Sequence, residues 1–198
     1  TVRVWDLSNV LRGETERGQV LGTHSSWVRA LAVTADGGFA ISAGKTVRVW
    51  SQKTLRLLHT LPVGCWVFSL AVCDVEQGGA MPNTIYAGCA DGVIRAWNIS
   101  EVNTGKEGFV QLSGHKGETK RAAAEVRAIA VNGAVLYSGG ADGRMRAWDL
   151  TSSPVSTRLL EDAHTASVRA IDADPCSNVV FSAAADRLIK VWGEGTPQ

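Results

Sequence analysis

Five short segments of this chain end in tryptophan and share the same pattern before it. Each reads apolar, basic, apolar and then Trp, and the gaps between successive tryptophans are 45, 47, 51 and 44 residues. Alternation with a period of two is typical of a strand, and recurrence at this spacing indicates an array of repeated β units. The segments end at Trp5, Trp50, Trp97, Trp148 and Trp192.

The composition fits a soluble all-β array. Of the 198 residues, 45% are hydrophobic, which allows a large buried core, and the 21 glycines suit many tight turns. The net charge of +1 gives no overall attraction to nucleic acid or to an acidic membrane, so neither is expected as a partner. No signal peptide or apolar run of membrane-spanning length is present, but the chain does not begin with Met, so a targeting segment before Thr1 stays open.

Four cysteines are scattered through the chain with no Cys-x-x-Cys pair. We interpret them as small buried residues in a reducing compartment, with a disulfide or metal framework as the alternative. A cytoplasmic or nuclear location is therefore expected. The cysteines are Cys65, Cys73, Cys89 and Cys176.

These features resemble the WD-repeat β-propeller family, and the resemblance covers essentially the whole chain. It rests on Trp-Asp pairs at Trp5 and Trp148, on Gly114-His115, and on an Asp that stands six residues before the Trp in three repeats. The resemblance implies an all-β propeller of four-stranded antiparallel blades, with strand a innermost and strand d outermost. We expect about four to five blades here, in a single segment that is part of a seven-bladed ring of roughly 300 residues.

The strand count is uneven along the chain. Residues 2–6 and 18–22 read as strands c and d of a first blade, three full blades follow, and the last blade lacks strand d. We therefore expect a fragment of a larger propeller, with a small ring, closed within this chain or by a second copy, as the alternative. Counted to each Trp, the expected repeat units are about 7–50, 51–97, 98–148 and 149–192, with 1–6 ending a preceding repeat and 193–198 as a tail. Counted by strands, the blades are about 24–61, 66–112, 125–161 and 167–192.

His, Ser and Asp recur beside these tryptophans, which raises the question of a hydrolase. A catalytic triad is needed once, in a cleft, whereas this set returns in several repeats, so we expect no catalytic residue. The resemblance implies a structural network instead, in which the Trp indole bonds to Ser, then to His, then to Asp. Its members are His24, Ser42 and Trp50 in the second blade, Asp91 and Trp97 in the third, His115, Ser138, Asp142 and Trp148 in the fourth, and His164, Ser182, Asp186 and Trp192 in the fifth.

Two blades depart from that pattern. The second lacks the Asp, and the third has Val63 and Ala87 at the His and Ser positions. We expect the second and third blades to be locally softer than the fourth and fifth. The histidines belong to different blades and have no ligand spacing, so neither a metal nor a cofactor is expected.

A ligand surface is predicted at the end of the propeller that carries the d–a and b–c loops, here called the top face. Each strand a begins at a Val, and the residues on either side of it share one face by strand alternation. Three of these strands place Arg after the Val, and the tryptophans outside the repeat phase precede it in two. The predicted binding residues are Trp27, Arg29, Trp66, Phe68, Arg127 and Arg169, with Arg144 and Arg187 from the b–c loops.

Further positive charge is expected at the top face from Lys45 and from the insertion 116–121. The opposite end carries acidic residues, namely Asp36, Asp74, Glu76, Glu101 and Asp174. Aromatic residues and Arg dominate interface hot spots, and Arg binds carboxylate or phosphate through paired hydrogen bonds. The top face is thus predicted to bind a partner protein or an acidic or phosphorylated peptide. The alternative is that the tryptophans pack between loops while the arginines are solvated or paired with Glu125.

The leading function is a protein-interaction scaffold or adaptor that is not an enzyme and has no small-molecule substrate. The alternative is a substrate-targeting propeller of a multidomain enzyme, such as a kinase or a ubiquitin ligase, whose catalytic part lies outside this sequence.

Overall fold

The computed structural model describes residues 1–5, 11–12, 18–73, 83–103, 109–115, 125–153, 155–174 and 176–193. Within these ranges strands dominate, and they form five antiparallel sheets joined in chain order. The predicted all-β propeller class is therefore confirmed. One short helix was not expected: α2 (Ile99–Asn103) begins where the Asn98 side-chain oxygen accepts the Ser100 N–H at 2.8 Å.

The sheets are the blades. The first contains β1 (Val2–Val4) and β2 (Gln19–Gly22). The second contains β3 (Ala30–Val33), β4 (Phe39–Ala43), β5 (Thr46–Ser51) and β6 (Leu57–Pro62). The third contains β7 (Val67–Cys73), β8 (Thr84–Cys89), β9 (Val93–Asn98) and β10 (Val110–Ser113).

The fourth blade contains β11 (Val126–Asn132), β12 (Val135–Gly140), β13 (Met145–Asp149) and β14 (Ser156–Leu160). The fifth contains β15 (Val168–Asp174), β16 (Val179–Ala184) and β17 (Ile189–Trp192). Among the described residues the first blade thus has its third and fourth strands only, and the fifth has no fourth strand.

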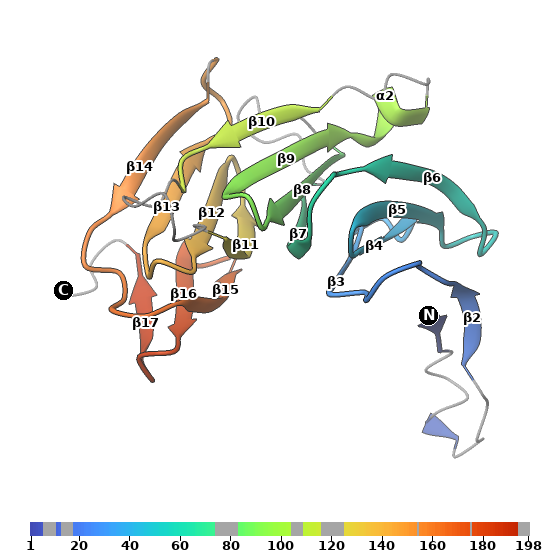
Figure 1. Ribbon diagram of the computed structural model, residues 1–198, viewed down its shortest axis with the longest axis horizontal. Helices are drawn as coiled ribbons and strands as arrows, with labels where there is room; N and C mark the ends of the chain where they lie inside the picture. The colour runs from blue at the N-terminus through green and yellow to red at the C-terminus, as the bar shows by residue number, and fades with distance from the viewer. Residues whose placement is uncertain are drawn as a thin grey trace.

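The blades follow one another around an open arc, with β3, β7, β11 and β15 on its inner side (Figure 1). Neighbouring inner strands contact one another, β3 with β7, β7 with β11 and β11 with β15. Consecutive strands of a blade are paired antiparallel. The loops that connect them therefore lie on the two opposite faces of the propeller. The inner strands and the loops beside their first residues therefore define one shared surface.

The core lies between blades rather than inside any one of them. The largest buried cluster joins the second and third blades, a second cluster joins the third and fourth, and a smaller one joins the fourth and fifth. The repeat tryptophans follow this order. Trp50, Trp97 and Trp148 are buried between blades, Trp192 in the fifth blade is half-buried, and Trp5 in the first blade is 52% exposed.

Candidate functional site

The fifth blade contains a continuous chain of hydrogen bonds from an indole to a carboxylate. The Trp192 indole N–H donates to Ser182 Oγ at 2.9 Å, and Ser182 Oγ lies 2.8 Å from His164 Nε2. His164 Nδ1 lies 2.8 Å from Asp186 Oδ2. A carboxylate only accepts, so the ring proton belongs on Nδ1 and Nε2 accepts from the Ser182 hydroxyl. The chain ties β16 and β17 to the loop before β15.

Asp186 is the last member of this series of hydrogen bonds and is held as a carboxylate. Burial acts to raise its pKa, but the Leu188 N–H, His164 and the Thr165 N–H together hold the pKa below its ordinary value. Leu188 donates to one carboxylate oxygen at 3.0 Å and Thr165 to the other at 3.1 Å. A hydrogen-bonded carboxylate of this kind keeps the histidine in a single orientation.

The fourth blade has the same four residues with a weaker final link. Trp148 donates to Ser138 Oγ at 2.8 Å, and Ser138 Oγ lies 2.7 Å from His115 Nε2. The distance from His115 Nδ1 to Asp142 Oδ1 is 3.9 Å, which is within ion-pair range and beyond hydrogen-bond range. His115 Nδ1 therefore has no hydrogen-bond partner in the described part of the chain.

In the second blade the series of hydrogen bonds ends at the histidine. Trp50 donates to Ser42 Oγ at 2.8 Å, and Ser42 Oγ lies 2.7 Å from His24 Nε2. His24 Nδ1 is buried without a hydrogen-bond partner among the residues that are described. Burial lowers the pKa of His24 below its ordinary value, with further contributions from Arg48 and the N-terminus. The ring is neutral at physiological pH as a result.

In the third blade apolar packing replaces the network. Val63 and Ala87, at the His and Ser positions, both belong to the cluster shared with the second blade. Asp91 instead accepts from Arg95, with Nη2 at 2.7 Å from Oδ2 and Nη1 at 3.1 Å from Oδ1. Replacing both partners of a buried hydrogen bond by apolar groups is close to neutral in free energy. Trp97 keeps its place and packs against Phe109, with ring centroids 5.7 Å apart.

The serines of these chains are not presented to a substrate. Ser42 and Ser138 are 0% exposed and Ser182 is 1% exposed, and each hydroxyl already has an indole and an imidazole as partners. A nucleophilic serine needs an open cleft at its oxygen. The geometry is that of a structural bond chain.

A second group of side chains lies at the top face, where the inner strands begin. We call Trp27, Arg29, Trp66, Phe68 and Arg127 the aromatic–arginine cluster. The Arg29 guanidinium carbon lies 5.5, 4.9 and 5.1 Å from the ring centres of Trp27, Trp66 and Phe68. The Arg127 guanidinium carbon lies 5.3 Å from the Phe68 ring centre. Each exposed contact of this kind contributes about 0.5–1 kcal/mol, so together they restrict Arg29.

The cluster contains exposed side chains, half-buried rings and one arginine that is already in an ion pair. Trp27 is 74% exposed and Arg29 is exposed, whereas Trp66 and Phe68 are half-buried. Arg127 forms an ion pair with Glu125, as one of the alternatives from the sequence supposed. Arg29 and Arg169 have no carboxylate within ion-pair distance among the described side chains.

Three of the inner strands carry a β-bulge at the position after their first Val. The pairing register shifts between Val67 and Ser69 in β7, and the corresponding shifts occur in β11 and β15. The regular alternation that the sequence suggested is therefore interrupted here, because a bulge residue has no directly opposed partner and its side chain is redirected. In β3 the strand itself begins at Ala30, after Arg29. The bulge residues are Phe68, Arg127 and Arg169.

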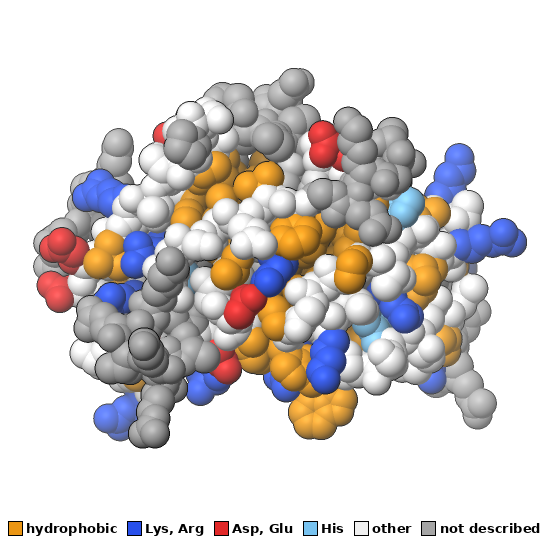
Figure 2. All heavy atoms as spheres, turned by 45° about the horizontal axis from the view of Figure 1, so that its top comes forward, with side chains coloured by type: hydrophobic (Ala, Val, Ile, Leu, Met, Phe, Trp, Pro, Cys, Tyr) orange, Lys and Arg blue, Asp and Glu red, His pale blue; other side chains and the backbone are white. Residues whose placement is uncertain are grey.

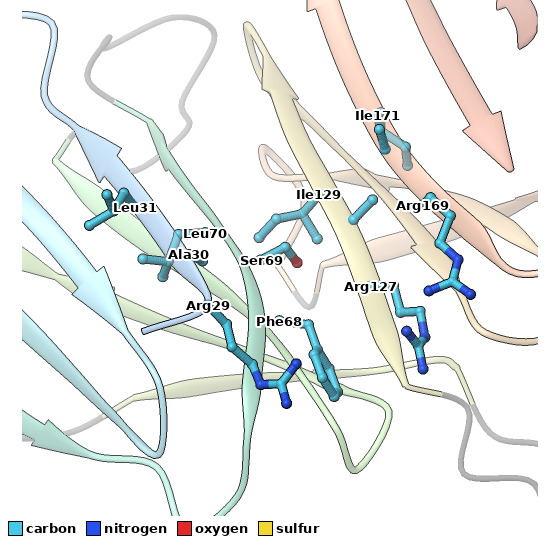
Figure 3. Close-up of a pocket in the computed structure, with 12 residues that line it drawn as sticks. Arg29, Ala30, Leu31, Phe68, Ser69, Leu70, Arg127, Ile129, Arg169 and Ile171 are labelled. Carbon is cyan, nitrogen blue, oxygen red and sulfur yellow. The ribbon is translucent and has the colours of Figure 1, made fainter. Parts of the chain in front are cut away.

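These residues line a concavity of about 340 Å³ on the inner side of the arc. Three consecutive residues from each inner strand form it, namely Arg29–Leu31, Phe68–Leu70, Arg127–Ile129 and Arg169–Ile171. Figure 3 shows the arginines and Phe68 at one end of the concavity and apolar side chains further along the strands. The concavity is thus basic and aromatic at its mouth and apolar beyond it.

The remaining predicted top-face residues do not line this concavity. Arg144 follows Gly143 in the β12–β13 turn, and Arg187 has φ of 71° in the β16–β17 turn. Lys45, in the β4–β5 turn, lies closer to the cluster, with Nζ 5.1 Å from the Trp66 ring centre. The insertion 116–121, Asp74 and Glu76 lie outside the described residues.

One cluster, in the third blade, was not predicted from the sequence. Cys65 Sγ, Cys89 Sγ and an Asp91 carboxylate oxygen all lie within 4.8 Å of one another, although no spacing motif connects them. The three residues are brought together by the pairing of β7 with β8. Val67 is opposite Cys89, and the Ala90 N–H donates to the Trp66 oxygen at 2.8 Å, which brings residue 65 beside the end of β8. All four cysteines are free thiols in this structure.

The repeated antiparallel sheets around an arc, three of them four-stranded, carry indole–serine–imidazole bonds in the second, fourth and fifth blades and define a β-propeller protein of the WD-repeat type. The family described as WD domain, G-beta repeat matches residues 15–51, 109–149 and 153–193. The chain belongs to this family.

Several known proteins are similar to this chain in sequence or in fold. The ubiquitin fusion degradation protein 3 homolog of Caenorhabditis elegans is 29% identical over 186 residues, which cover 87% of this chain and 20% of that protein. The computationally designed Ika4 protein matches with a TM-score of 0.65 and 28% identity, over 89% of this chain and 98% of Ika4. U3-55K matches in fold, with a TM-score of 0.72 and 22% identity, over 88% of this chain and 51% of U3-55K.

Among the described helices, none is long and apolar enough to span a bilayer.

Proposed function

We propose that this propeller segment is a protein-interaction scaffold and that its top face binds a partner peptide through an acidic or phosphorylated side chain. The observation that carries the proposal is the position of Arg29. Three aromatic rings hold its guanidinium at the mouth of the inner concavity, and no described carboxylate neutralises it. A restricted guanidinium loses little entropy when it binds a carboxylate or phosphate through two parallel hydrogen bonds.

The surroundings supply the rest of a binding site. Trp27 offers a large exposed ring beside the cation, and Arg169 adds a second positive charge on the same concavity that no carboxylate of the described residues pairs with. Exposed Trp and Arg are the residue types that carry most of the energy in protein interfaces. Arg127, already paired with Glu125, contributes less net charge.

The distribution of charge favours a peptide over a nucleic acid. On the side of the molecule drawn in Figure 2, the described Lys and Arg side chains are scattered among hydrophobic and uncharged ones rather than gathered into one stripe. Nucleic-acid binding depends on many phosphate contacts along a basic path. Recognition by a few fixed guanidinium groups beside aromatic rings matches one anionic side chain in an apolar segment.

The test is a titration of phosphorylated and unphosphorylated versions of one degenerate peptide library, followed by tryptophan fluorescence and by anisotropy of a label. We expect selective binding of the phosphorylated library, and a loss of about tenfold in affinity, or about 1.4 kcal/mol, for Arg29→Ala. Arg158→Ala is the matched control, because Arg158 is exposed on the outer strand β14 and is expected to change nothing. Equal binding of the two libraries, or unchanged affinity in Arg29→Ala, would contradict the proposal.

A second candidate is that the segment targets a larger enzyme to its substrates. It is supported by the length of the C. elegans relative, of which the chain covers 20%, and by the ubiquitin fusion degradation in the name of that protein. Both candidates require the same binding surface. The sequence of the complete transcript distinguishes them, because only the second requires a catalytic domain in the same polypeptide.

A further inference from the structure

We propose that Cys65 is a site of oxidation by hydroperoxides and that Cys89 is the thiol that then closes a disulfide with it. Cys65 lies between β6 and β7, and Cys89 is the last residue of β8. Their sulfur atoms lie within 4.8 Å of each other, and both are free thiols. A disulfide joins its sulfur atoms at about 2.0 Å, so the two neighbouring thiols must approach each other further before they bond.

Arg95 places a cation next to the Cys65 sulfur. Its Nη1 lies 3.6 Å from Cys65 Sγ, and Asp91 holds the same guanidinium through both carboxylate oxygens. A neighbouring cation stabilises the thiolate, which is the nucleophilic form of cysteine. Nη1 is shared between Cys65 and Asp91, so the carboxylate positions the guanidinium and also offsets part of its charge.

The two cysteines differ in exposure, and this difference sets the order of events. Cys65 is half-buried, so part of this residue is open to solvent, whereas Cys89 is 0% exposed. Burial raises the pKa of Cys89 to about 12, with the neighbouring Cys65 adding to the shift and Arg95 acting against it. Cys89 therefore keeps its proton and reacts second.

The chemistry balances with one molecule of hydrogen peroxide as the oxidant. The Cys65 thiolate attacks one peroxide oxygen, an S–O bond forms, the O–O bond breaks, and the leaving hydroxide takes up a proton to become water. This step oxidises Cys65 to a sulfenic acid and reduces the peroxide. The Cys89 sulfur then attacks the Cys65 sulfur, the S–S bond forms, the S–O bond breaks, and the departing hydroxide leaves as water with the Cys89 proton.

A metal site is the competing interpretation of the same three atoms, and Arg95 argues against it. Both Asp91 oxygens already accept from the guanidinium, with Nη2 at 2.7 Å from Oδ2. A thiophilic cation would have to displace this charge and take the proton from the buried Cys89. The arrangement is therefore closer to that of a redox-active thiol pair than to a metal centre.

The chain contains two reference cysteines for a test. Cys176 is exposed and lies beside Asp174, whose Oδ1 accepts the Cys176 N–H at 2.9 Å. Cys73 is buried at 2% exposure. If exposure alone controlled reactivity, Cys176 would react first.

The experiment is oxidation of the full chain with a small excess of hydrogen peroxide in the presence of EDTA, followed by peptide mass mapping over time. We expect a Cys65–Cys89 disulfide, reversed by dithiothreitol, to form about tenfold faster than modification of Cys176. In Cys89→Ala, dimedone is expected to trap a sulfenic acid at Cys65. Arg95→Gln is expected to slow the oxidation, and Arg95→Lys to slow it less.

The wild-type comparison of Cys65 with Cys176 decides the matter even if the Arg95 variants fail to fold. Modification of Cys176 at the same rate or faster overturns the proposal. So does a disulfide that joins Cys65 to another molecule instead of to Cys89. Stoichiometric zinc that is bound to the purified chain and released when Cys65 is alkylated overturns it in favour of the metal site.

Discussion

Gly139 of β12 lies directly against Val168, the first residue of β15 in the next blade. A methyl group placed on Gly139 would come within 2.4 Å of Val168 Cγ1, which is closer than non-bonded carbon atoms approach. Gly88 of β8 stands in the same relationship to Val126, where the added carbon would come within 2.8 Å of Val126 Cγ1. A glycine in the second strand of one blade thus accommodates the first valine of the next, and both valines are 0% exposed.

The first prediction concerns this contact between blades. Gly139→Ala is expected to lower the free energy of unfolding by about 1–3 kcal/mol, because the extra methyl group overpacks a closed interface. Gly88→Ala is expected to act in the same direction. Urea denaturation followed by circular dichroism measures both.

Gly193→Ala serves as the control, since the nearest atom to its added carbon is at 3.4 Å, an ordinary contact. If Gly139→Ala were as stable as Gly193→Ala, the interface would be loosely packed and the interpretation wrong.

The second prediction separates the serines of two blades. Ser42→Ala removes the acceptor of the Trp50 indole, which is 2% exposed, and is expected to cost about 1–3 kcal/mol because the N–H is left buried and unpaired. Ser182→Ala is expected to cost less, because Trp192 is half-buried and water can reach its indole. Thermal and urea denaturation of both variants provide the comparison.

Ser113→Ala, on the exposed end of β10, is the control and is expected to stay within about 0.5 kcal/mol of wild type. A larger loss of stability for Ser182→Ala than for Ser42→Ala would contradict this prediction. It would show that the completeness of the hydrogen-bond series, and not the burial of the indole, sets the loss.

The third prediction concerns pH and His24. The pKa of His24 is lowered in the folded chain, chiefly by burial and then by Arg48 and the N-terminus. The unfolded chain therefore binds a proton at this position more readily, and stability falls as the pH drops through about 6.5 toward the lowered folded value. His24→Gln is expected to show a weaker loss of stability between pH 7.5 and 5.5 than wild type.

That pH range lies above the titration of the aspartates, so the difference between the two proteins isolates His24. Identical pH profiles for wild type and His24→Gln would contradict the shift.

The fourth prediction concerns local stability. From the Trp–Ser–His–Asp hydrogen bonds alone, the second and third blades are expected to have lower local stability than the fourth and fifth. The packing indicates a different order, because the largest buried cluster joins the second and third blades while Leu188 and Ile189 of the fifth are 52% and 75% exposed. We expect slower amide hydrogen exchange in β8 than in β16, despite the complete bond chain at Ser182.

Hydrogen exchange with mass spectrometry measures these strands separately, and β12 of the fourth blade provides an intermediate reference. Greater protection in β16 than in β8 would restore the order that the network suggests.

Much of the fold follows from the sequence alone. The spacing of Trp50, Trp97 and Trp148 marks the third strand of each blade, because a buried indole at a fixed repeat length leaves few alternatives to stacked sheets. The uneven strand count at the two ends was also visible, since strands are short local patterns with clear turn signals between them.

The sites required the tertiary structure. The bulges at Phe68, Arg127 and Arg169 are features of strand pairing that alternation in one strand does not reveal. The three rings around Arg29 come from two blades, and the neighbourhood of Cys65, Cys89 and Arg95 depends on how the ends of β7 and β8 align.

The sequence by itself determined which residues repeat and therefore which secondary structures form. The tertiary structure decided which of the non-repeating residues meet. Repeated residues meet equivalent neighbours in every blade, so their roles can be inferred from periodicity. Residues outside the repeat, such as Trp27, Trp66 and Cys65, have neighbours set by packing between blades and by strand register, which act over distances that no local pattern encodes.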